Sequence, residues 1–290
     1  MIARMRPLSP DLCVLLFAGV VHAQDAQEPP WDRLRSAAAD AAVVVAHRGA
    51  SADFPENTIA ALRAAVAAGA LVVEFDVHQT RDGAWVVLHD ETCDRTTDAV
   101  QEFGRNQVRI DQLDLGDART LDAGAWKGSQ FAGERIPTLE QALAAVFPAV
   151  PMIERKGGDP RALAAELRRL GVIDRVLVQA FDWPWLTLLH EAEPTLLLGA
   201  LGEGPLDREV LAKALATGAR IVHWDHRRVD VDIAAAVRAG GNLLCVYTVD
   251  ADIGLLGASA IGCDLITTNR PARLVELQQR GLCARRNTPR

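Results

Sequence analysis

Charged side chains gather at the ends of three apolar runs of this sequence. The stretch HRGAS begins at His47 directly after VVVA, Glu74 and Asp76 lie within VVEFDV, and MIERK contains Glu154 and Lys156. Unpaired charge is costly beside buried apolar residues. These groups are therefore expected to compensate one another or to hold a ligand.

Three of these groups are carboxylates, Glu74, Asp76 and Glu154. Carboxylates that are brought together repel one another unless a proton or a cation lies between them. Oxygen-only ligands suit a hard divalent cation, whereas zinc is usually bound through cysteine or histidine. The three residues are therefore predicted to bind one divalent cation, Ca²⁺ or Mg²⁺.

Two histidines and two cationic residues accompany the carboxylates. His47 and His89 belong to the residue type whose ordinary pKa, near ~6.5, lets one act as base and the other as acid at neutral pH. Arg48 and Lys156 supply positive charge, and arginine can bind a phosphate through two parallel hydrogen bonds. The combination predicts cleavage of a P–O bond in a phosphodiester. Taken singly, each histidine would more often be structural, so the prediction depends on the assembled group.

A predicted hairpin brings His89 to the carboxylates. The apolar run of residues 85–88 leaves no room for a helix after the preceding strand, and Asp82-Gly83 is typical of a two-residue type I′ turn. Counting outward from this turn places Asp76 opposite His89, and opposed residues of antiparallel strands share a face. A slip of one residue would separate them.

Eight β-rich runs alternate with helical patterns along the chain. The predicted parallel strands cover residues 43–47, 71–78, 151–154, 175–180, 196–201, 220–224, 243–249 and 264–268. The helical patterns between them include residues 57–68, 160–170, 207–216 and 231–239. Continuous apolar strands that alternate with helices indicate a parallel sheet covered on both faces. Eight such units predict a (β/α)8 barrel, with a doubly wound open sheet as the alternative.

The carboxyl ends of the strands form the active site of such a barrel. His47 ends the first predicted strand, Asp76 lies near the end of the second, and Glu154 ends the third, so all converge on one rim. Residues 91–137 show no clear periodicity and predict an insertion after the hairpin, near the substrate mouth.

Both ends of the chain are predicted to lie outside the barrel domain of residues 43–282. Residues 1–23 combine arginines, a short apolar run and small residues before the expected cleavage point, which is typical of a signal peptide and too short to span a membrane. A lead-in segment of residues 24–42 and a tail of residues 283–290 complete the chain. We expect an exported protein, periplasmic or secreted after cleavage near Ala23, without a stable membrane anchor.

Composition limits the partners of this protein. Its 290 residues carry a net charge of −7, which argues against a broad basic surface for nucleic acid. An anionic small-molecule substrate therefore needs local positive charge. Four cysteines follow the predicted signal peptide, and export would permit either disulfides or isolated buried thiols among them: Cys93, Cys245, Cys263 and Cys283.

Together these motifs resemble the glycerophosphodiester phosphodiesterase family. The resemblance is carried by HRGAS with PENT, by VEFDVHQTRDGAWVVLHD and by MIERK, and it extends over about residues 43–271. It implies a (β/α)8 barrel with a small insertion after the hairpin, and hydrolysis of glycerophosphodiesters to glycerol phosphate and an alcohol with a divalent cation. By motif position it also implies an acid/base pair, His47 and His89, the metal ligands Glu74, Asp76 and Glu154, and the phosphate contacts Arg48 and Lys156.

The sequence departs from the family pattern at three places around the expected substrate pocket. Members often have serine in place of Ala180, Trp-Thr in place of Tyr247-Thr248, and Thr-Asp-Xaa-Pro in place of the stretch that contains Asn269. No proposed metal or acid/base group is affected. The departures bear on the leaving-group pocket, whose expected lining residues are Phe181, Trp224 and Tyr247.

Two other functions are compatible with the sequence. A phospholipase D-type relative would act on lysophospholipid or sphingomyelin and would need an apolar groove, for which Trp126, Phe131, Trp183 and Trp185 are candidates. A non-catalytic exported protein could bind phosphodiesters on an inherited barrel. Such a protein would be expected to lack one of the site histidines or carboxylates, and this sequence contains all of them.

Overall fold

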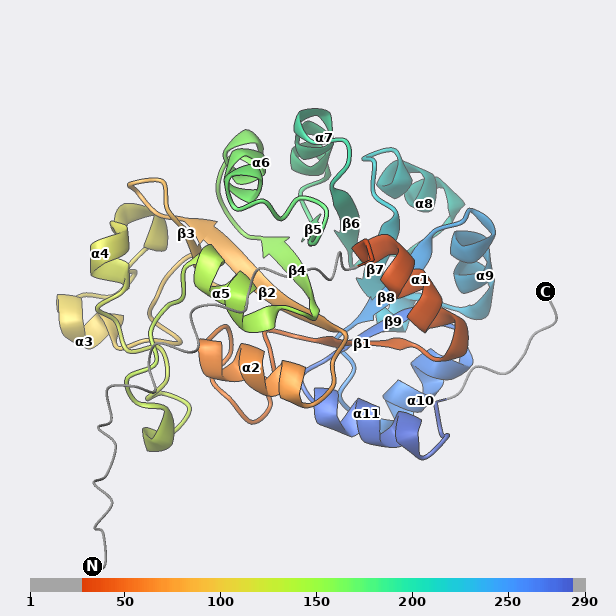
Figure 1. The fold of residues 1–290 in the computed structure, drawn as a ribbon, viewed down its shortest axis with the longest axis horizontal. Helices are drawn as coiled ribbons and strands as arrows, with labels where there is room; N and C mark the ends of the chain where they lie inside the picture. The colour runs from red at the N-terminus through yellow and green to blue at the C-terminus, as the bar shows by residue number, and fades with distance from the viewer. Residues whose placement is uncertain (1–27, 284–290) are drawn as a thin grey trace, which may run out of the picture.

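Parallel strands close into a barrel in the computed structural model, which describes residues 28–283 (Figure 1). The strand order is β1-β9-β8-β7-β6-β5-β4-β2, and pairing of β1 with β2 closes the ring. This confirms the predicted (β/α)8 barrel over the open sheet. Within the described residues the barrel strands are β1 (Val43–Ala46), β2 (Val72–Gln79), β4 (Val150–Arg155), β5 (Leu177–Ala180), β6 (Leu197–Gly202), β7 (Ile221–Asp225), β8 (Leu243–Tyr247) and β9 (Leu265–Thr268).

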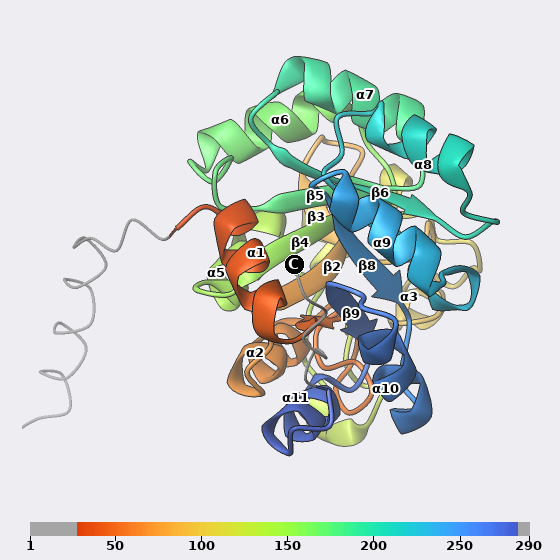
Figure 2. The same cartoon turned by 90° about the vertical axis from the view of Figure 1, so that its right-hand side faces the viewer.

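Helices cover the outside of the sheet, as α6, α7 and α8 do over β5 and β6 in Figure 2. Several begin at a Thr or Asp whose side chain accepts a hydrogen bond from the first turn, as Thr58 does from Ala61 and Asp159 from Ala162. The long helices of the described chain are α1 (Pro30–Asp40), α2 (Ile59–Ala67), α5 (Leu139–Val146), α6 (Pro160–Arg169), α7 (Trp183–Ala192), α8 (Arg208–Leu215), α9 (Val231–Ala239), α10 (Asp252–Ala260) and α11 (Pro271–Gln279).

The alternation of side chains along the strands separates two apolar layers. Phe75 and Val77 of β2 point outward and pack beneath the helices. Val43 and Val45 of β1 point inward and meet the first residues of the other strands inside the barrel. Toward the carboxyl ends of β2 and β4 the inward-facing residues are polar. The apolar core inside the barrel therefore occupies only its amino-terminal half.

Helix α1 covers the amino-terminal end of the barrel. Leu34 and Ala38, one turn apart on α1, pack against the inward-facing residues at the strand starts, and Leu34 is fully buried. Residues 24–42 were predicted only as a lead-in segment. The helix therefore belongs to the barrel core, although it precedes the first strand.

The hairpin after β2 has a different register from the one predicted. Strand β3 (Trp85–Val87) pairs with β2 so that Asp76 lies opposite Leu88, which donates its backbone N–H to the Asp76 carbonyl at 3.1 Å. The loop contains three residues, 81–83, and not two. The predicted pairing of Asp76 with His89 is therefore wrong by one residue.

The cause of this shift lies in Thr80. Its hydroxyl donates to the Asp82 carboxylate at 2.6 Å and accepts from the Ala84 N–H at 3.0 Å, which closes the loop one residue earlier than Asp-Gly alone suggests. Gly83 takes φ +87°, the left-handed conformation that ends a three-residue hairpin loop.

The insertion of residues 91–137 forms a small core of its own. Val86 and Leu88 from the hairpin pack with Leu121 and Ile136, all of them buried. The insertion contains short helical segments that the sequence did not reveal: α3 (Ala99–Phe103), η2 (Ile110–Gln112), α4 (Leu115–Ala118) and η3 (Ser129–Phe131). The segment is therefore a folded lobe attached to the hairpin.

Three further expectations concern the chain ends, the cysteines and the membrane. The predicted signal peptide lies outside the described residues. Cys93, Cys245 and Cys283 are buried free thiols, which agrees with the isolated-thiol alternative for these three. No helix between residues 28 and 283 has the length and apolar character needed to cross a membrane.

Candidate active site

His47 and Arg48 stand where β1 ends at the carboxyl rim of the barrel. His47 continues the inward-facing series of β1 and its N–H bonds to the Thr268 carbonyl at 2.9 Å. The chain then turns sharply, with Arg48 at φ +55° and Gly49 at φ +80°. A Cβ at Gly49 would lie 2.5 Å from the backbone carbon of Ala61 in α2, so only glycine fits here.

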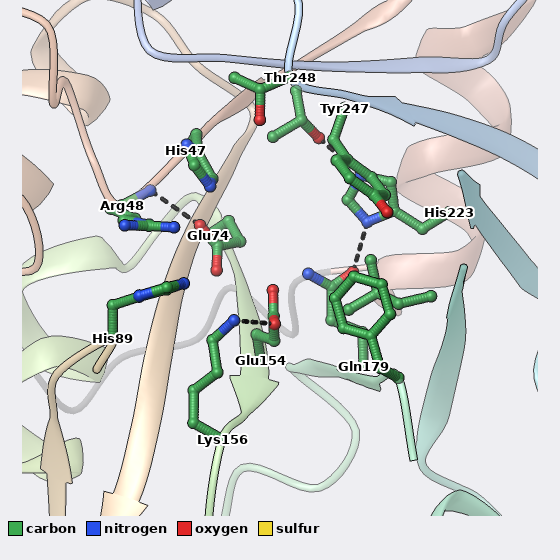
Figure 3. Close-up of a pocket in the computed structure, with 13 residues that line it drawn as sticks. His47, Arg48, Glu74, His89, Glu154, Lys156, Gln179, His223, Tyr247 and Thr248 are labelled. Carbon is green, nitrogen blue, oxygen red and sulfur yellow. Dashed lines mark hydrogen bonds and ion pairs between the residues drawn. The ribbon is translucent and has the colours of Figure 1, made fainter. Parts of the chain in front are cut away.

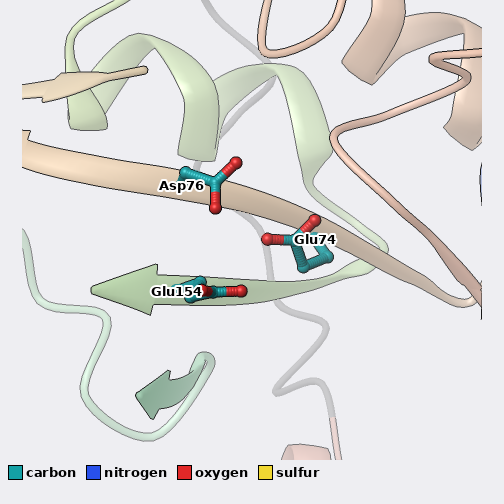
Figure 4. Close-up of side chains that lie close together, drawn as sticks. All are labelled: Glu74, Asp76 and Glu154. Atoms are coloured by element: carbon teal, nitrogen blue, oxygen red, sulfur yellow. The ribbon is translucent and has the colours of Figure 1, made fainter. Parts of the chain in front are cut away.

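The three predicted metal ligands come together beside this turn (Figure 4). Glu74 and Asp76 point inward from β2, and Glu154 lies on β4 directly beside Asp76 in the sheet register. One oxygen from each of the three lies within 4.8 Å of the others, and all three residues are buried. The cluster forms because alternate residues of β2 share one face and because the pairing of β4 with β2 places Glu154 beside Asp76.

The carboxylate cluster has the properties expected of a cation-binding site. Glu74 Oε1 is buried without a hydrogen-bond partner, and buried Asp76 Oδ1 has only an ion-pair contact with Lys156. Burial and the neighbouring Asp76 raise the pKa of Glu74 well above its usual range and that of Glu154 to about 7. Burial opposes ionisation of Asp76 as well, but Lys156 and Arg48 outweigh it and lower the pKa of Asp76. An all-oxygen donor set that includes an unpartnered Glu74 oxygen fits a hard divalent cation.

Two cations border the cluster, as predicted. Lys156 Nζ lies 3.3 Å from Asp76 Oδ1 and also contacts Glu154. Arg48 Nε lies 3.3 Å from Asp76 Oδ2, and the Arg48 N–H donates to Glu74 Oε2 at 2.8 Å. Both cationic groups face the same cavity as the carboxylates, where they can meet an anionic substrate (Figure 3).

His47 is held in one orientation by Asn269, which follows β9. Its Nδ1 lies 2.7 Å from Asn269 Oδ1, while the Asn269 amide donates to Asp250 Oδ2 at 2.6 Å. Because an amide oxygen only accepts, Nδ1 carries the proton and Nε2 keeps its lone pair. Burial, and then the charge of Arg48, lower the pKa of His47 to about 4, so it is neutral at pH 7 with Nε2 able to accept a proton.

His89 reaches the same cavity although the hairpin register differs from the prediction. Strand β3 ends at Val87, Leu88 makes a last backbone hydrogen bond to Asp76, and the chain then leaves the pairing with β2. His89 Nδ1 lies 2.5 Å from Asp90 Oδ1. A hydrogen bond from Arg95, at 2.6 Å, holds the pKa of Asp90 at about 2, so Asp90 is ionised. Burial nevertheless lowers the pKa of His89 below its ordinary value, because the charges of Asp76 and Asp90 offset it only in part.

The cavity of about 230 Å³ extends from this cluster toward the centre of the barrel. Phe181 and Tyr247 line it as predicted, with ring centroids 6.1 Å apart in an edge-to-face arrangement. Trp224 does not line it. Residues alternate along β7, so Trp224 points outward, where it is 2% exposed and donates to the Gly204 carbonyl.

Sequence reasoning missed a buried polar network at the cavity floor. His223 Nδ1 lies 2.6 Å from Gln179 Oε1, and its Nε2 lies 2.9 Å from the Thr267 hydroxyl. Burial lowers the pKa of His223 to about 3, so this histidine is a neutral structural link. Asp90 and Asn269, the partners of the two site histidines, were also not assigned that role, although Asp90 adjoins His89 in sequence.

We expect Asn269→Ala to lower kcat roughly 10- to 100-fold, the usual effect of removing a partner that orients a functional side chain. His47 would lose the acceptor for its Nδ1 proton and could adopt the other tautomer. Steady-state kinetics measure the change, with Asn242→Ala as the control because the Asn242 side chain bonds to the nearby Gly240 carbonyl. An unchanged kcat would show that Asn269 does not position His47.

Comparisons with known proteins place this chain in a family. The chain matches the model of the glycerophosphoryl diester phosphodiesterase family over residues 47–273. A glycerophosphodiester phosphodiesterase of Caldanaerobacter subterraneus is 33% identical over 247 residues, which cover 82% of this chain and 98% of that protein. One from Bacillus subtilis is 30% identical, covering 80% of this chain and 85% of the relative.

Solved structures resemble the fold to a similar extent. An Oleispira antarctica phosphodiesterase in complex with the product sn-glycerol-3-phosphate superposes with a TM-score of 0.74 at 25% identity, covering 82% of this chain and 97% of that one. A glycerophosphodiester phosphodiesterase from Agrobacterium tumefaciens gives a TM-score of 0.68 at 29% identity, covering 81% and 99%. The likeness thus spans the whole barrel.

Proposed function

Because this chain belongs to the glycerophosphoryl diester phosphodiesterase family, a family of phosphoric diester hydrolases, we propose that it hydrolyses glycerophosphodiesters to glycerol phosphate and an alcohol at the site around His47 and His89. The observation that carries the proposal is the buried carboxylate cluster, with an unpartnered oxygen on Glu74, bordered by two histidines and two cations in one cavity.

Glu74, Asp76 and Glu154 would hold a divalent cation, Ca²⁺ or Mg²⁺, which when bound supplies charge stabilisation at a phosphate oxygen. Arg48 and Lys156 bind the remaining phosphate oxygens. Both are held beside Asp76, at 3.3 Å, so their positions are fixed before the substrate arrives. Such preorganised positive charge stabilises the charge that develops on phosphate in the transition state.

The two histidines divide the proton transfers. Neutral His47 takes the proton of the attacking hydroxyl at its free Nε2, because Nδ1 is committed to Asn269. His89, whose Nδ1 is hydrogen-bonded to Asp90, gives a proton to the leaving alkoxide from its other ring nitrogen. The P–O bond to the alcohol breaks as a P–O bond to the attacking oxygen forms, so one proton enters and one leaves the histidine pair.

A substrate panel tests this function. Glycerophosphocholine, glycerophosphoethanolamine and lysophosphatidylcholine are incubated with the protein in Ca²⁺, Mg²⁺ or chelator, and ³¹P NMR follows the products. We expect glycerol phosphate from the first two substrates and only with a divalent cation. Transient glycerol cyclic phosphate would identify the substrate's own hydroxyl as the attacking group, and its absence would favour water.

The same panel separates the two alternatives. Faster turnover of lysophosphatidylcholine would favour the phospholipase D-type enzyme. Of the aromatic residues expected for an acyl groove, Trp185 is 5% exposed and Trp183 bonds through its indole to Leu201, so both are committed to packing. Binding of the diesters without turnover under any metal condition would favour a non-catalytic protein.

A further inference from the structure

A second hollow adjoins the active site, and we call it the basic cavity. Its volume is about 440 Å³, and it shares His47 and Arg48 with the cavity described above. Its other walls come from the Ser51 turn, from the insertion at Trp126 and Lys127, and from the segment after β9. Both cavities therefore border Arg48, and each can accept one ester arm of a diester whose phosphate is bound there.

The two cavities differ in charge. The basic cavity is lined by four cationic side chains and two carboxylates, a formal charge of +2 in a protein whose net charge is −7. The far wall of the first cavity carries no charge and includes Phe181, Leu201 and Tyr247. An anionic arm is thus favoured on one side of the phosphate and an uncharged arm on the other.

Two cations of the basic cavity are available to a ligand. Arg95 is already paired with both Glu56 and Asp90. Among residues 28–283, in contrast, no carboxylate lies within ion-pair distance of Lys127 or Arg270: Lys127 Nζ donates to the Ser51 carbonyl at 2.9 Å, and Arg270 Nη1 bonds to a backbone carbonyl at 3.3 Å.

We propose that the basic cavity, in place of the expected pocket at Phe181 and Tyr247, binds the leaving alcohol and selects glycerophosphodiesters whose alcohol carries a further phosphate group; this rests on the function proposed above. His89, the proposed proton donor, is linked to the basic cavity through Asp90 and Arg95. The Lys127 ammonium keeps two hydrogen-bond donors beyond its bond to Ser51, and the Arg270 guanidinium can bind a phosphate through two parallel bonds. A cationic head group would meet the same two charges unfavourably.

A matched substrate pair tests the proposal. Glycerophosphoinositol and glycerophosphoinositol 4-phosphate differ only in the second phosphate, and both are assayed at several salt concentrations with the full chain. We expect the wild type to give a kcat/KM at least about tenfold higher on the phosphorylated substrate at low salt, with the advantage shrinking as salt screens the charges.

The variant for this test is Lys127→Ala combined with Arg270→Ala. It should lower kcat/KM on the phosphorylated substrate by about tenfold or more, mainly through KM, and leave glycerophosphoinositol within about twofold. The control combines Lys213→Ala with Arg169→Ala, which removes the same charge from the exposed last turns of α8 and α6. Thermal melting checks that each variant is folded.

The outcomes separate the inference from the function on which it rests. Normal turnover of glycerophosphoinositol with no preference for the phosphorylated substrate, or an equal loss on both substrates in the variant, overturns the inference alone. No turnover of any diester under any metal condition overturns the proposed function and the inference with it.

Discussion

Glu154→Gln is expected to lower kcat on glycerophosphocholine by roughly 10³-fold, because losing one ligand of a catalytic cation removes several kcal/mol of transition-state stabilisation. Glutamine has nearly the same shape as glutamate but lacks its charge and one of its acceptor oxygens. Glu154 lies beside Asp76 in the sheet, so the substitution acts directly on the cluster. Initial rates at saturating substrate measure the effect.

Thermal unfolding provides a second measurement for the same variant. A cation that binds only the folded protein stabilises it in proportion to the logarithm of the ion concentration. The wild type should therefore melt at a higher temperature with Ca²⁺ or Mg²⁺ than in chelator, and Glu154→Gln should lose most of that increase. In chelator the variant should be no less stable than the wild type, because one of three mutually repelling buried carboxylates is gone. Equal metal-induced shifts in both proteins would exclude Glu154 as a ligand.

His47→Ala and His89→Ala should each lower kcat by about 10²-fold or more, the usual contribution of a general acid or base. The structure gives each histidine its own partner, Asn269 for His47 and Asp90 for His89, so the two losses reflect different proton transfers. Rates are measured on glycerophosphocholine with the preferred cation.

His190→Ala serves as the matched control for the histidine variants, because His190 lies on α7 and lines neither cavity. A second comparison uses a substrate with an activated leaving group such as p-nitrophenol. His89→Ala should recover much of its activity there, since a good leaving group needs no proton, whereas His47→Ala should not. Near-normal turnover of glycerophosphocholine by a folded His89→Ala variant would remove that residue from the proton transfers.

The site could be predicted from sequence because strand ends and carboxylate spacing are local features. Glu74 and Asp76 are two residues apart on one strand, so they share a face whatever surrounds them. The barrel then brings the carboxyl end of β4, with Glu154, to the same rim. For these residues the pattern of the chain and the topology of the fold were sufficient.

The hairpin register required information that the sequence pattern does not contain. Asp-Gly occurs in hairpin loops of two residues and of three, and here the Thr80 hydroxyl decides between them. His89 still reaches the cavity because β3 ends at Val87 and the chain turns away from the ladder. His89 therefore lies at the cavity as predicted, although the predicted register of the hairpin was wrong.

The family departure at Asn269 has a different consequence from the one expected. From sequence, the departures concerned the leaving-group pocket. In the structure Asn269 contacts His47, and Asp250 stands behind it as the charged partner of the amide. The pairing joins segments more than 200 residues apart, so only the closed barrel reveals that this position acts on the histidine.

The basic cavity could not be predicted from the sequence either, because its lining residues are far apart in the chain. Trp126 and Lys127 belong to the insertion, which has no periodic pattern, and Arg270 follows the last strand. Their approach depends on how the insertion folds on its own small core. Nothing in the sequence pattern indicates that Lys127 and Arg270 line the same cavity.

Activity as a function of bound cation tests the central proposal most directly. Metal-free protein is prepared with chelator, and glycerol phosphate release from glycerophosphocholine is measured as Ca²⁺ or Mg²⁺ is titrated back. The cluster of Glu74, Asp76 and Glu154 predicts no measurable turnover without the cation and saturation of the rate at one ion per chain. Full turnover in chelator, or saturation that survives in Glu154→Gln, would contradict it.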